Sequence, residues 1–268
     1  MTPQGPEGPH PLPGGSAALV AGHAGHELRV HAWLEQARPV VFVLTDGSGH
    51  GDAGRLASTS RTLARAGATP GSIFGRLTDR QVYDLLVRRE VGFWGTLAIE
   101  LAEALQRHQV DYLVADAAEG FNPTHDLCRY ITDAAAARLA HQTGRSLPVY
   151  EFDLDAAPDA DAATAVAFRL DLDEAALERK VSAGLGYVEM RGEVEQLLAR
   201  FGRAAFAVEA FRPATSGRIR WTPERSAGYE RHGRERVARG IYQTLITYED
   251  HLAPVQAALA AVAGTIAP

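Results

Sequence analysis

The sequence predicts an α/β fold, a Rossmann-like parallel sheet flanked by helices, with a mostly helical C-terminal extension. The first observation is a set of continuous apolar runs, such as residues 40–45, which are typical of strands buried on both faces. The second is that helical segments alternate with these runs through short connections, the pattern of βαβ units. The third is a change after residue 150, where helical periodicity dominates.

The elements are expected in the following order. A disordered tail rich in Pro and Gly covers residues 1–15. Strands are predicted at 16–20, 40–45, 71–75, 110–115 and 147–150, and helices at 27–38, 55–66, 79–89, 93–108 and 125–142. Later helices are predicted at 174–182, 191–201 and 234–261, the first capped by Asp173 and the last broken near Pro254. We expect one domain over 16–268, with the sheet core in 16–150 and the helical part packing on it.

Composition and charge exclude several classes of protein. The chain has 268 residues, 46% hydrophobic and 22% charged, which is typical of a globular protein. Its net charge of -6 argues against a nucleic-acid partner or a polybasic membrane contact. No apolar run reaches the ~18 residues of a membrane span, and the single cysteine, Cys128, excludes a disulfide framework. We expect a cytoplasmic protein acting on a small-molecule substrate, and homo-oligomerisation stays open.

Histidines gather in the loops that follow the predicted strands. His23 and His26 lie in the first such loop and His125 follows the third. Ligands of open α/β sheets bind outside the carboxyl ends of the strands, so these side chains are expected to meet. Three imidazoles leave one metal position open for water, as in catalytic zinc sites. The alternative is a His-x-x-His spacing that arose by chance.

Carboxylates and an amide in the same loops are candidate catalytic groups. Glu119 has no evident turn or capping role and is our candidate acid/base residue. Asp46 and Asp116 are further candidates, although each can simply start an Asx-turn. Asp126 is more simply explained as a charge at the beginning of its helix. Asn122 is a candidate donor to a carbonyl or oxyanion.

Two further residues are candidate substrate contacts. Arg55, at the start of a helix, can anchor a substrate hydroxyl or acid, or can be a solvated helix residue. His232 lies in the helical C-terminal part, which can cover the site. The glycine-rich stretch 47–51 can bind an anion or act as a lid or plain turn.

Several segments resemble, in order, the motifs of the GlcNAc-phosphatidylinositol de-N-acetylase-like family, also called LmbE-like. Residues 20–27, VAGHAGHE, resemble a divergent form of its AHPDDE motif, and 43–47, VLTDG, are similar to its VVTDG stretch. The helix from Arg55 resembles the family's R-x-x-E helix, NPTH at 122–125 falls where the family has HPDH, and 177–183 resemble its K-x-x-A helix. The resemblance covers about residues 17–182 and implies a Rossmann-like domain with a metal-dependent deacetylase site.

The same resemblance assigns the metal ligands and shows where this chain departs from the family. It implies His23, His26 and His125 as ligands, with His26 in place of an aspartate. One divalent ion is expected, Zn²⁺ first, although Fe²⁺, Co²⁺ or Ni²⁺ also suit this set. Gly25 stands where the family has its general-base aspartate, and Asn122 replaces the first histidine of HPDH. The resemblance therefore implies a retained ligand frame with an altered acid/base apparatus.

These observations predict a metal-dependent hydrolase that cleaves a C–N bond, amide or N-acyl, in a small polar metabolite of bacterial specialised metabolism. Because glycine cannot accept a proton, we expect poor activity in the family's standard deacetylation. Two alternatives remain open. The first is a metalloenzyme of the same fold with a lyase, isomerase or redox reaction, and the second is a non-catalytic relative that binds a metal or metabolite.

Overall fold

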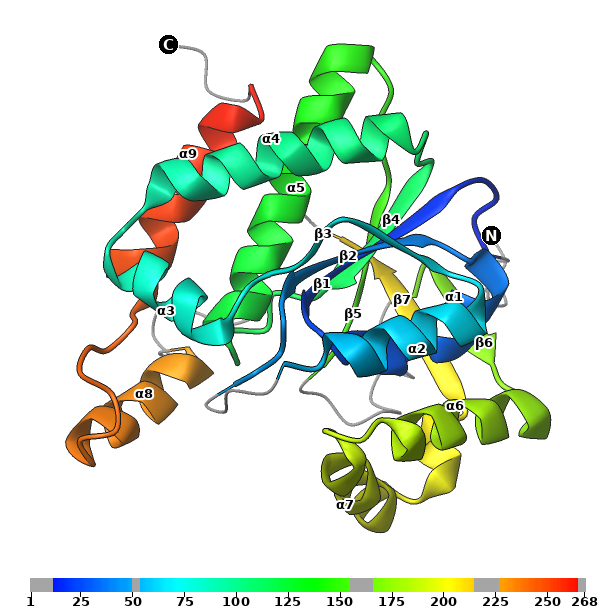
Figure 1. The fold of residues 1–268 in the computed structure, drawn as a ribbon. Helices are drawn as coiled ribbons and strands as arrows, with labels where there is room; N and C mark the ends of the chain where they lie inside the picture. Colours follow the sequence, from blue (N-terminus) through cyan, green and yellow to red (C-terminus); the bar gives the residue numbers. More distant parts are fainter. Residues whose placement is uncertain (1–11, 50–53, 155–165, 215–226, 265–268) are drawn as a thin grey trace, which may run out of the picture.

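The computed structural model describes residues 12–49, 54–154, 166–214 and 227–264, and most of the predicted tail lies outside these ranges. A seven-stranded sheet of order β3-β2-β1-β4-β5-β7-β6 lies at its centre (Figure 1). Its strands are β1 Ala17–His23, β2 Val40–Thr45, β3 Thr69–Leu77, β4 Tyr112–Asp116, β5 Val149–Phe152, β6 Phe168–Asp171 and β7 Val208–Pro213. The first five strands are parallel, whereas β7 is antiparallel to β5 and to β6. The predicted α/β class is confirmed, with a mixed sheet.

Helices cover both faces of the sheet. The α-helices are α1 His31–Ala37, α2 Leu56–Ala66, α3 Asp79–Val87, α4 Val91–Arg107, α5 Pro123–Thr143, α6 Glu174–Gly186, α7 Arg191–Phe201, α8 Gly228–Ala238 and α9 Ala253–Val262. The described residues also form the short helices η1 His26–Val30, η3 Arg203–Phe206 and η4 Tyr248–Leu252. Helices α4, α5 and α9 pack together on one face, while α1, α2 and α6 lie on the other (Figure 1).

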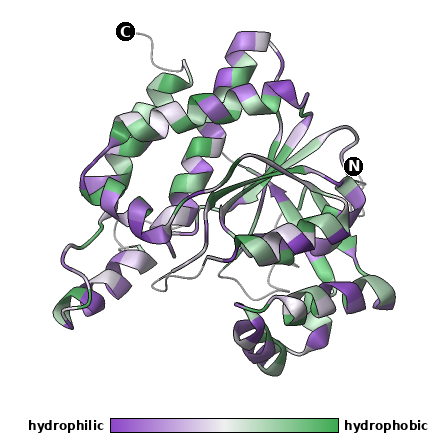
Figure 2. Cartoon of the chain, in the orientation of Figure 1, coloured by the Kyte–Doolittle hydropathy of each residue, from purple (hydrophilic) through white to green (hydrophobic). Residues whose placement is uncertain are grey.

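Two hydrophobic cores result from the alternation of side chains along the central strands. In β1, Val20 faces the core formed with α4, α5 and α9, and its neighbour Leu19 faces the opposite core. In β2, Phe42 faces the first of these cores and its neighbour Val41 faces the second. Both faces are apolar, which explains the continuous hydrophobic runs of the sequence and the largely hydrophobic colouring of the strands in Figure 2.

The C-terminal part differs from the prediction in two respects. It is not only helical, because β6 and β7 extend the sheet; charged residues such as Arg169, Glu209 and Arg212 interrupt the apolar run by which the other strands were recognised. The helix predicted at 234–261 is instead divided into α8, η4 and α9. Pro254 lies in the first turn of α9, directly after η4 ends at Leu252, so the helical run changes its type near the predicted break. Asp173 caps α6 as expected, accepting from the Ala176 amide at 2.8 Å.

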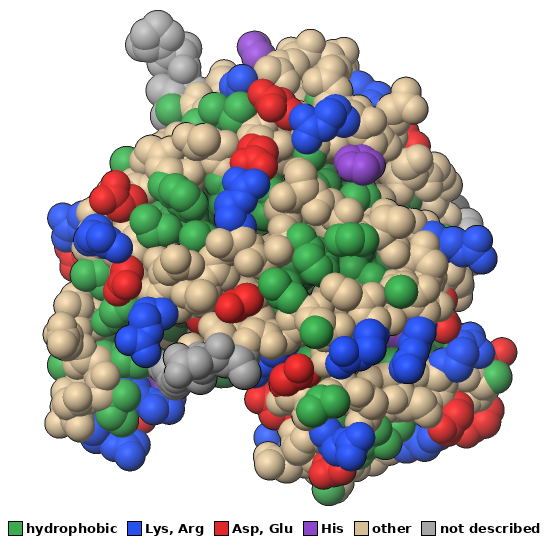
Figure 3. All heavy atoms as spheres, in the orientation of Figure 1, with side chains coloured by type: hydrophobic (Ala, Val, Ile, Leu, Met, Phe, Trp, Pro, Cys, Tyr) green, Lys and Arg blue, Asp and Glu red, His purple; other side chains and the backbone are tan. Residues whose placement is uncertain are grey.

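The topology brings the carboxyl ends of β1, β2 and β4 together. The β1–β2 register pairs His23 with Thr45, and β4 ends at Asp116 on the other side of β1. Figure 3 shows the surface hollowed between α8 and the α6–α7 pair, toward which these strand ends run in Figure 1. Among the described residues, no helix is both long and apolar enough to span a membrane.

Candidate metal centre

Three histidines predicted as ligands lie together at the carboxyl ends of the strands. His23 ends β1, His26 begins η1, and His125 lies in the first turn of α5. Their ring centroids are 5.1 Å apart for His23–His26, 5.1 Å for His23–His125 and 4.7 Å for His26–His125. One nitrogen from each ring lies within 4.8 Å of the others. The side chains form a cluster that can hold a metal ion.

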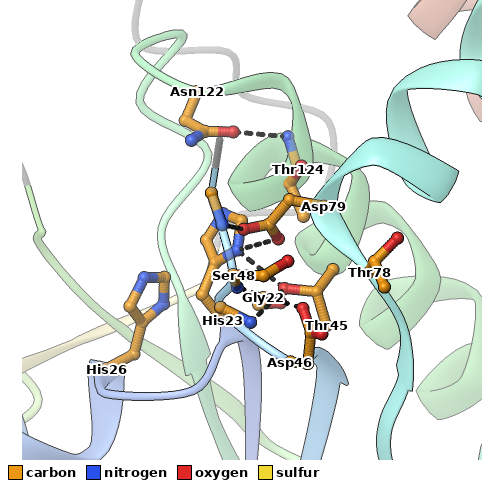
Figure 4. Close-up of polar contacts among 12 residues, drawn as sticks. Gly22, His23, His26, Thr45, Asp46, Ser48, Thr78, Asp79, Asn122 and Thr124 are labelled. Atoms are coloured by element: carbon orange, nitrogen blue, oxygen red, sulfur yellow. Dashed lines mark hydrogen bonds and ion pairs between the residues drawn. The ribbon is translucent and has the colours of Figure 1, made fainter. Parts of the chain in front are cut away.

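The Nδ1 atom of His23, on the side of the ring away from the cluster, is held by two protein groups. Its Nδ1 lies 2.8 Å from Asp79 Oδ1 and 2.7 Å from Thr45 Oγ1 (Figure 4). A carboxylate partner requires the proton on Nδ1, which leaves the lone pair on Nε2. That Nε2 is buried and has no hydrogen-bond partner among the described residues. His23 therefore presents a ready ligand atom to the cluster.

His26 has an equivalent arrangement with a second carboxylate. Its Nδ1 lies 2.8 Å from Asp116 Oδ2, and the same oxygen accepts from the Gly22 amide at 2.7 Å. Asp116 is completely buried, so its position is fixed by these bonds and by the end of β4. The ring is oriented with Nε2 as its available nitrogen.

Burial and its neighbours keep His125 neutral. Its ring is 6% exposed, and its Nδ1 has no hydrogen-bond partner among the described residues. Burial lowers the pKa of His125 well below its usual value, and the adjacent His26 and His23 lower it further. A neutral imidazole has a free lone pair, which metal binding requires.

These residues fit a divalent metal ion. Zinc–nitrogen bonds of about 2.0–2.1 Å in a tetrahedron place ligand nitrogens ~3.4 Å apart. The three ring nitrogens, which lie within 4.8 Å of one another, need only small side-chain movements to reach that spacing. Asp79 and Asp116 supply negative charge behind His23 and His26. Carboxylate–histidine–metal arrangements of this kind are typical of zinc sites.

Asp79 was not foreseen from the sequence. Thr78 and Gln81 form a capping box that starts α3, and this local pattern predicts the helix. It does not predict that Asp79 reaches a histidine 56 positions earlier in the chain. Burial alone would raise the pKa of Asp79, but hydrogen bonds from His23, Thr45 and the Gly49 amide outweigh it and hold the pKa well below its usual value. Asp79 is therefore a carboxylate at neutral pH.

Position 25, between two of the histidines, has a glycine backbone conformation and lies under the side chain of Met190. Gly25 has φ of 108°, in the left-handed region that favours glycine. A Cβ built on it would lie 2.3 Å from Met190 Sδ and 3.6 Å from the Tyr187 hydroxyl. The connection between α6 and α7 thus fills the space beside this glycine.

The predicted catalytic residues also have structural contacts. Asp46 Oδ1 accepts from the Ser48 amide at 3.0 Å, which is the Asx-turn that the sequence left as an alternative. Asn122 caps α5, its Oδ1 accepting from the Thr124 amide at 2.8 Å (Figure 4). Glu119 Oε2 accepts from the Leu154 amide at 2.9 Å. The catalytic roles of Glu119, Asn122 and Asp46 stay predictions.

The predicted substrate contacts lie on two different elements. Arg55 precedes α2, and its backbone carbonyl accepts from the Tyr187 hydroxyl at 3.2 Å. His232 is exposed on α8, where its Nε2 accepts from Arg236 at 3.2 Å. The start of α8 is joined to the β4–α5 loop by the bond from the Tyr229 amide to the Gly120 carbonyl. Both substrate roles stay predictions, and part of the 47–51 stretch lies outside the described residues.

A buried carboxyl beside the cluster also escaped the sequence analysis. Glu27 is completely buried, and its Oε2 accepts from the Gly25 amide at 2.8 Å. Burial raises the pKa of Glu27 to about 7 despite hydrogen bonds that lower it. Its place directly after His26 was the only signal for it. Cys128 is buried, and burial raises the pKa of its thiol well above the usual value, as expected for a packing residue.

Comparisons with known proteins identify similar folds only. No family model matches the sequence, and no curated protein matches it. The structure is similar to that of the conserved protein TT1542 from Thermus thermophilus, with a TM-score of 0.48, 16% identity and coverage of 79% of this chain and 99% of that chain. A deacetylase–teicoplanin complex of the teicoplanin biosynthesis pathway gives a TM-score of 0.48, 14% identity and coverage of 75% and 100%. The zinc-inhibited form of teicoplanin deacetylase gives a TM-score of 0.44 and 13% identity, and the match covers 84% of this chain and 94% of that chain.

Proposed function

We propose that this protein is a metal-dependent hydrolase that cleaves a C–N bond, amide or N-acyl, in a small polar metabolite. The observation that carries the proposal is the convergence of His23, His26 and His125, two of them held by carboxylates. A divalent ion bound there polarises a carbonyl and lowers the pKa of water, the chemistry that amide hydrolysis needs.

The protein's own groups orient the ligands and the substrate. Asp79 and Asp116 accept from the Nδ1 atoms of His23 and His26, which fixes the direction of both rings. Asn122 uses its oxygen to cap α5, so its amide nitrogen points away from that helix (Figure 4). We assign this nitrogen to the substrate carbonyl, to which it donates a hydrogen bond.

Proton transfer is assigned to Glu119. It lies in the loop between β4 and α5, the same loop that leads into His125, and its side chain is half-buried. The Leu154 amide holds Oε2 and so limits the directions that the carboxylate can take. A carboxylate near a divalent cation stays ionised at neutral pH and is therefore ready to accept a proton from water.

A panel of amides tests the proposal. Protein loaded with one equivalent of Zn²⁺ is assayed against N-acetyl sugars, N-acyl amino acids and simple N-acyl amines, with release of the amine as the readout. We expect turnover of at least one class, and loss of both zinc and turnover in His125→Ala. Turnover that persists in a His23→Ala, His125→Ala double variant without zinc would contradict the proposal.

Position 25 favours a second candidate, a metal- or metabolite-binding relative without hydrolytic turnover. Gly25 has no side chain that could accept a proton, and Met190 Sδ occupies the space in which one would lie. Full zinc occupancy with no hydrolysis of any amide would support this candidate or a lyase, isomerase or redox reaction. Metabolites that shift the melting temperature without being changed would then identify a binding protein.

A further inference from the structure

An apolar cavity lies on the other side of Gly25. It has a volume of about 110 Å³ and lies between η1, α6, α7 and β7. Its apolar walls include Leu28, Val181, Leu197, Leu198, Phe206 and Val208. A cavity of this lining excludes strongly hydrated groups and favours an aliphatic one.

The charged side chains that line the cavity form ion pairs or hydrogen bonds with other groups of the protein. Lys180, whose side chain is 8% exposed, lies 2.8 Å from Glu209 Oε1 and donates to the Arg29 carbonyl at 2.8 Å. The Arg29 guanidinium donates to the Asp153 carbonyl at 3.0 and 3.1 Å. The charged residues that line the cavity are two cations, Arg29 and Lys180, and two carboxylates, Asp153 and Glu209, so the lining offers no excess charge to an ion. Its occupant is therefore uncharged.

Met190 stands between this cavity and the loop of the histidines. Both Gly25 and Met190 line the cavity, and the thioether lies directly over the glycine. In the chain, Gly25 follows His23 by two positions and directly precedes His26. Methionine is unbranched and turns readily about three bonds, so its side chain is a movable wall.

We propose that this cavity binds an unbranched aliphatic chain of about four or five carbons, carried by the substrate of the histidine site. The length follows from the volume, since an apolar cavity of ~150 Å³ holds the six carbons of benzene. The binding of an aliphatic chain is argued from the cavity alone, whereas its attachment to the substrate of the histidine site rests on the proposed function. The chain can belong to the acyl side or to the amine side of the scissile bond.

A titration with linear alcohols tests the cavity without any turnover. We expect the affinity to rise about fourfold per methylene from ethanol to pentanol, because each buried CH₂ contributes ~0.8 kcal/mol. Leu198→Trp fills the cavity and removes the rise, as does Leu197→Phe if the first variant folds poorly. Val188→Trp, on an exposed residue of the same α6–α7 connection, is the matched control. Equal affinities along the series, or an unchanged series in both filling variants, would overturn the binding site.

Two amide series then locate the chain on the substrate. With zinc-loaded protein, one series lengthens the acyl group of a single amine, and the other lengthens the amine of acetamides. We expect kcat/KM to rise about fourfold per methylene in one series only. Leu198→Trp should abolish the rise and leave the rate of the shortest amide unchanged. Hydrolysis without length dependence in either series overturns the assignment to the substrate, whereas no hydrolysis at all overturns the proposed function, and the alcohol titration still decides the cavity.

Discussion

Replacing Asp116 by Asn should weaken zinc binding about 10–100-fold, which corresponds to ~1.4–2.7 kcal/mol. The amide has nearly the same size as the carboxylate, and its oxygen can still accept from the Gly22 amide and from His26 Nδ1. What is lost is the negative charge that raises the basicity of the His26 ring. In the metal-free protein, two hydrogen bonds to a charged acceptor would become bonds to a neutral one, so the protein should also lose about 1–3 kcal/mol of stability.

The two effects are measured separately. Zinc affinity is obtained by competition with a chromophoric chelator at neutral pH, and stability by urea unfolding of the metal-free protein. Asp171→Asn is the matched control, because its side chain is 59% exposed at the far edge of the sheet. Zinc affinity of Asp116→Asn equal to that of the wild type would refute the reasoning.

Two further predictions concern the histidine site, and a third concerns the buried His31 of α1. Glu119→Gln keeps an oxygen for the Leu154 amide but removes basicity, so kcat should fall ~10² or more with zinc content unchanged; full activity would exclude Glu119. Gly25→Asp should destabilise the protein because a φ of 108° strains any residue with a Cβ and because the side chain collides with Met190; adding Met190→Ala should recover only the part of the stability lost to the collision and should raise the rate on N-acetyl sugars. A single variant as stable as the wild type would contradict this. Burial lowers the pKa of His31, so the folded chain stays neutral where the unfolded chain, with a pKa of ~6.5, is protonated. Stability should therefore fall below pH ~6.5, by up to ~1.4 kcal/mol per pH unit, and His31→Gln should flatten this loss in urea unfolding; an unchanged slope would contradict it.

The sequence predicted the buried strands and the meeting of the three histidines, because these depend only on local hydrophobic pattern and on one rule of topology. Apolar runs such as Val40–Thr45 predicted strands with two buried faces, and β2 has these same bounds. Because the carboxyl ends of parallel strands meet at one edge, His23, His26 and His125 were expected together although 99 positions separate His26 from His125. The rule needs only strand directions, which the pattern supplies.

The remainder depends on contacts that no local pattern encodes. Asp79 lies at the start of a helix like any capping-box residue, and only the packing of α3 brings it to His23. Met190 closes the space beside Gly25 from a connection 165 positions away. The two antiparallel strands were missed because charged residues interrupt their apolar pattern, and because β7 owes its place in the sheet to pairing with β5 and β6.

Anomalous diffraction at the zinc edge, from crystals of protein supplied with one equivalent of Zn²⁺, tests the central claim most directly. The account predicts one peak about 2.0–2.1 Å from a ring nitrogen of each of His23, His26 and His125. It also predicts that Asp79 and Asp116 keep their bonds to the opposite nitrogens of His23 and His26. A peak elsewhere in the molecule, or a peak that one of the three rings does not contact, would contradict the account.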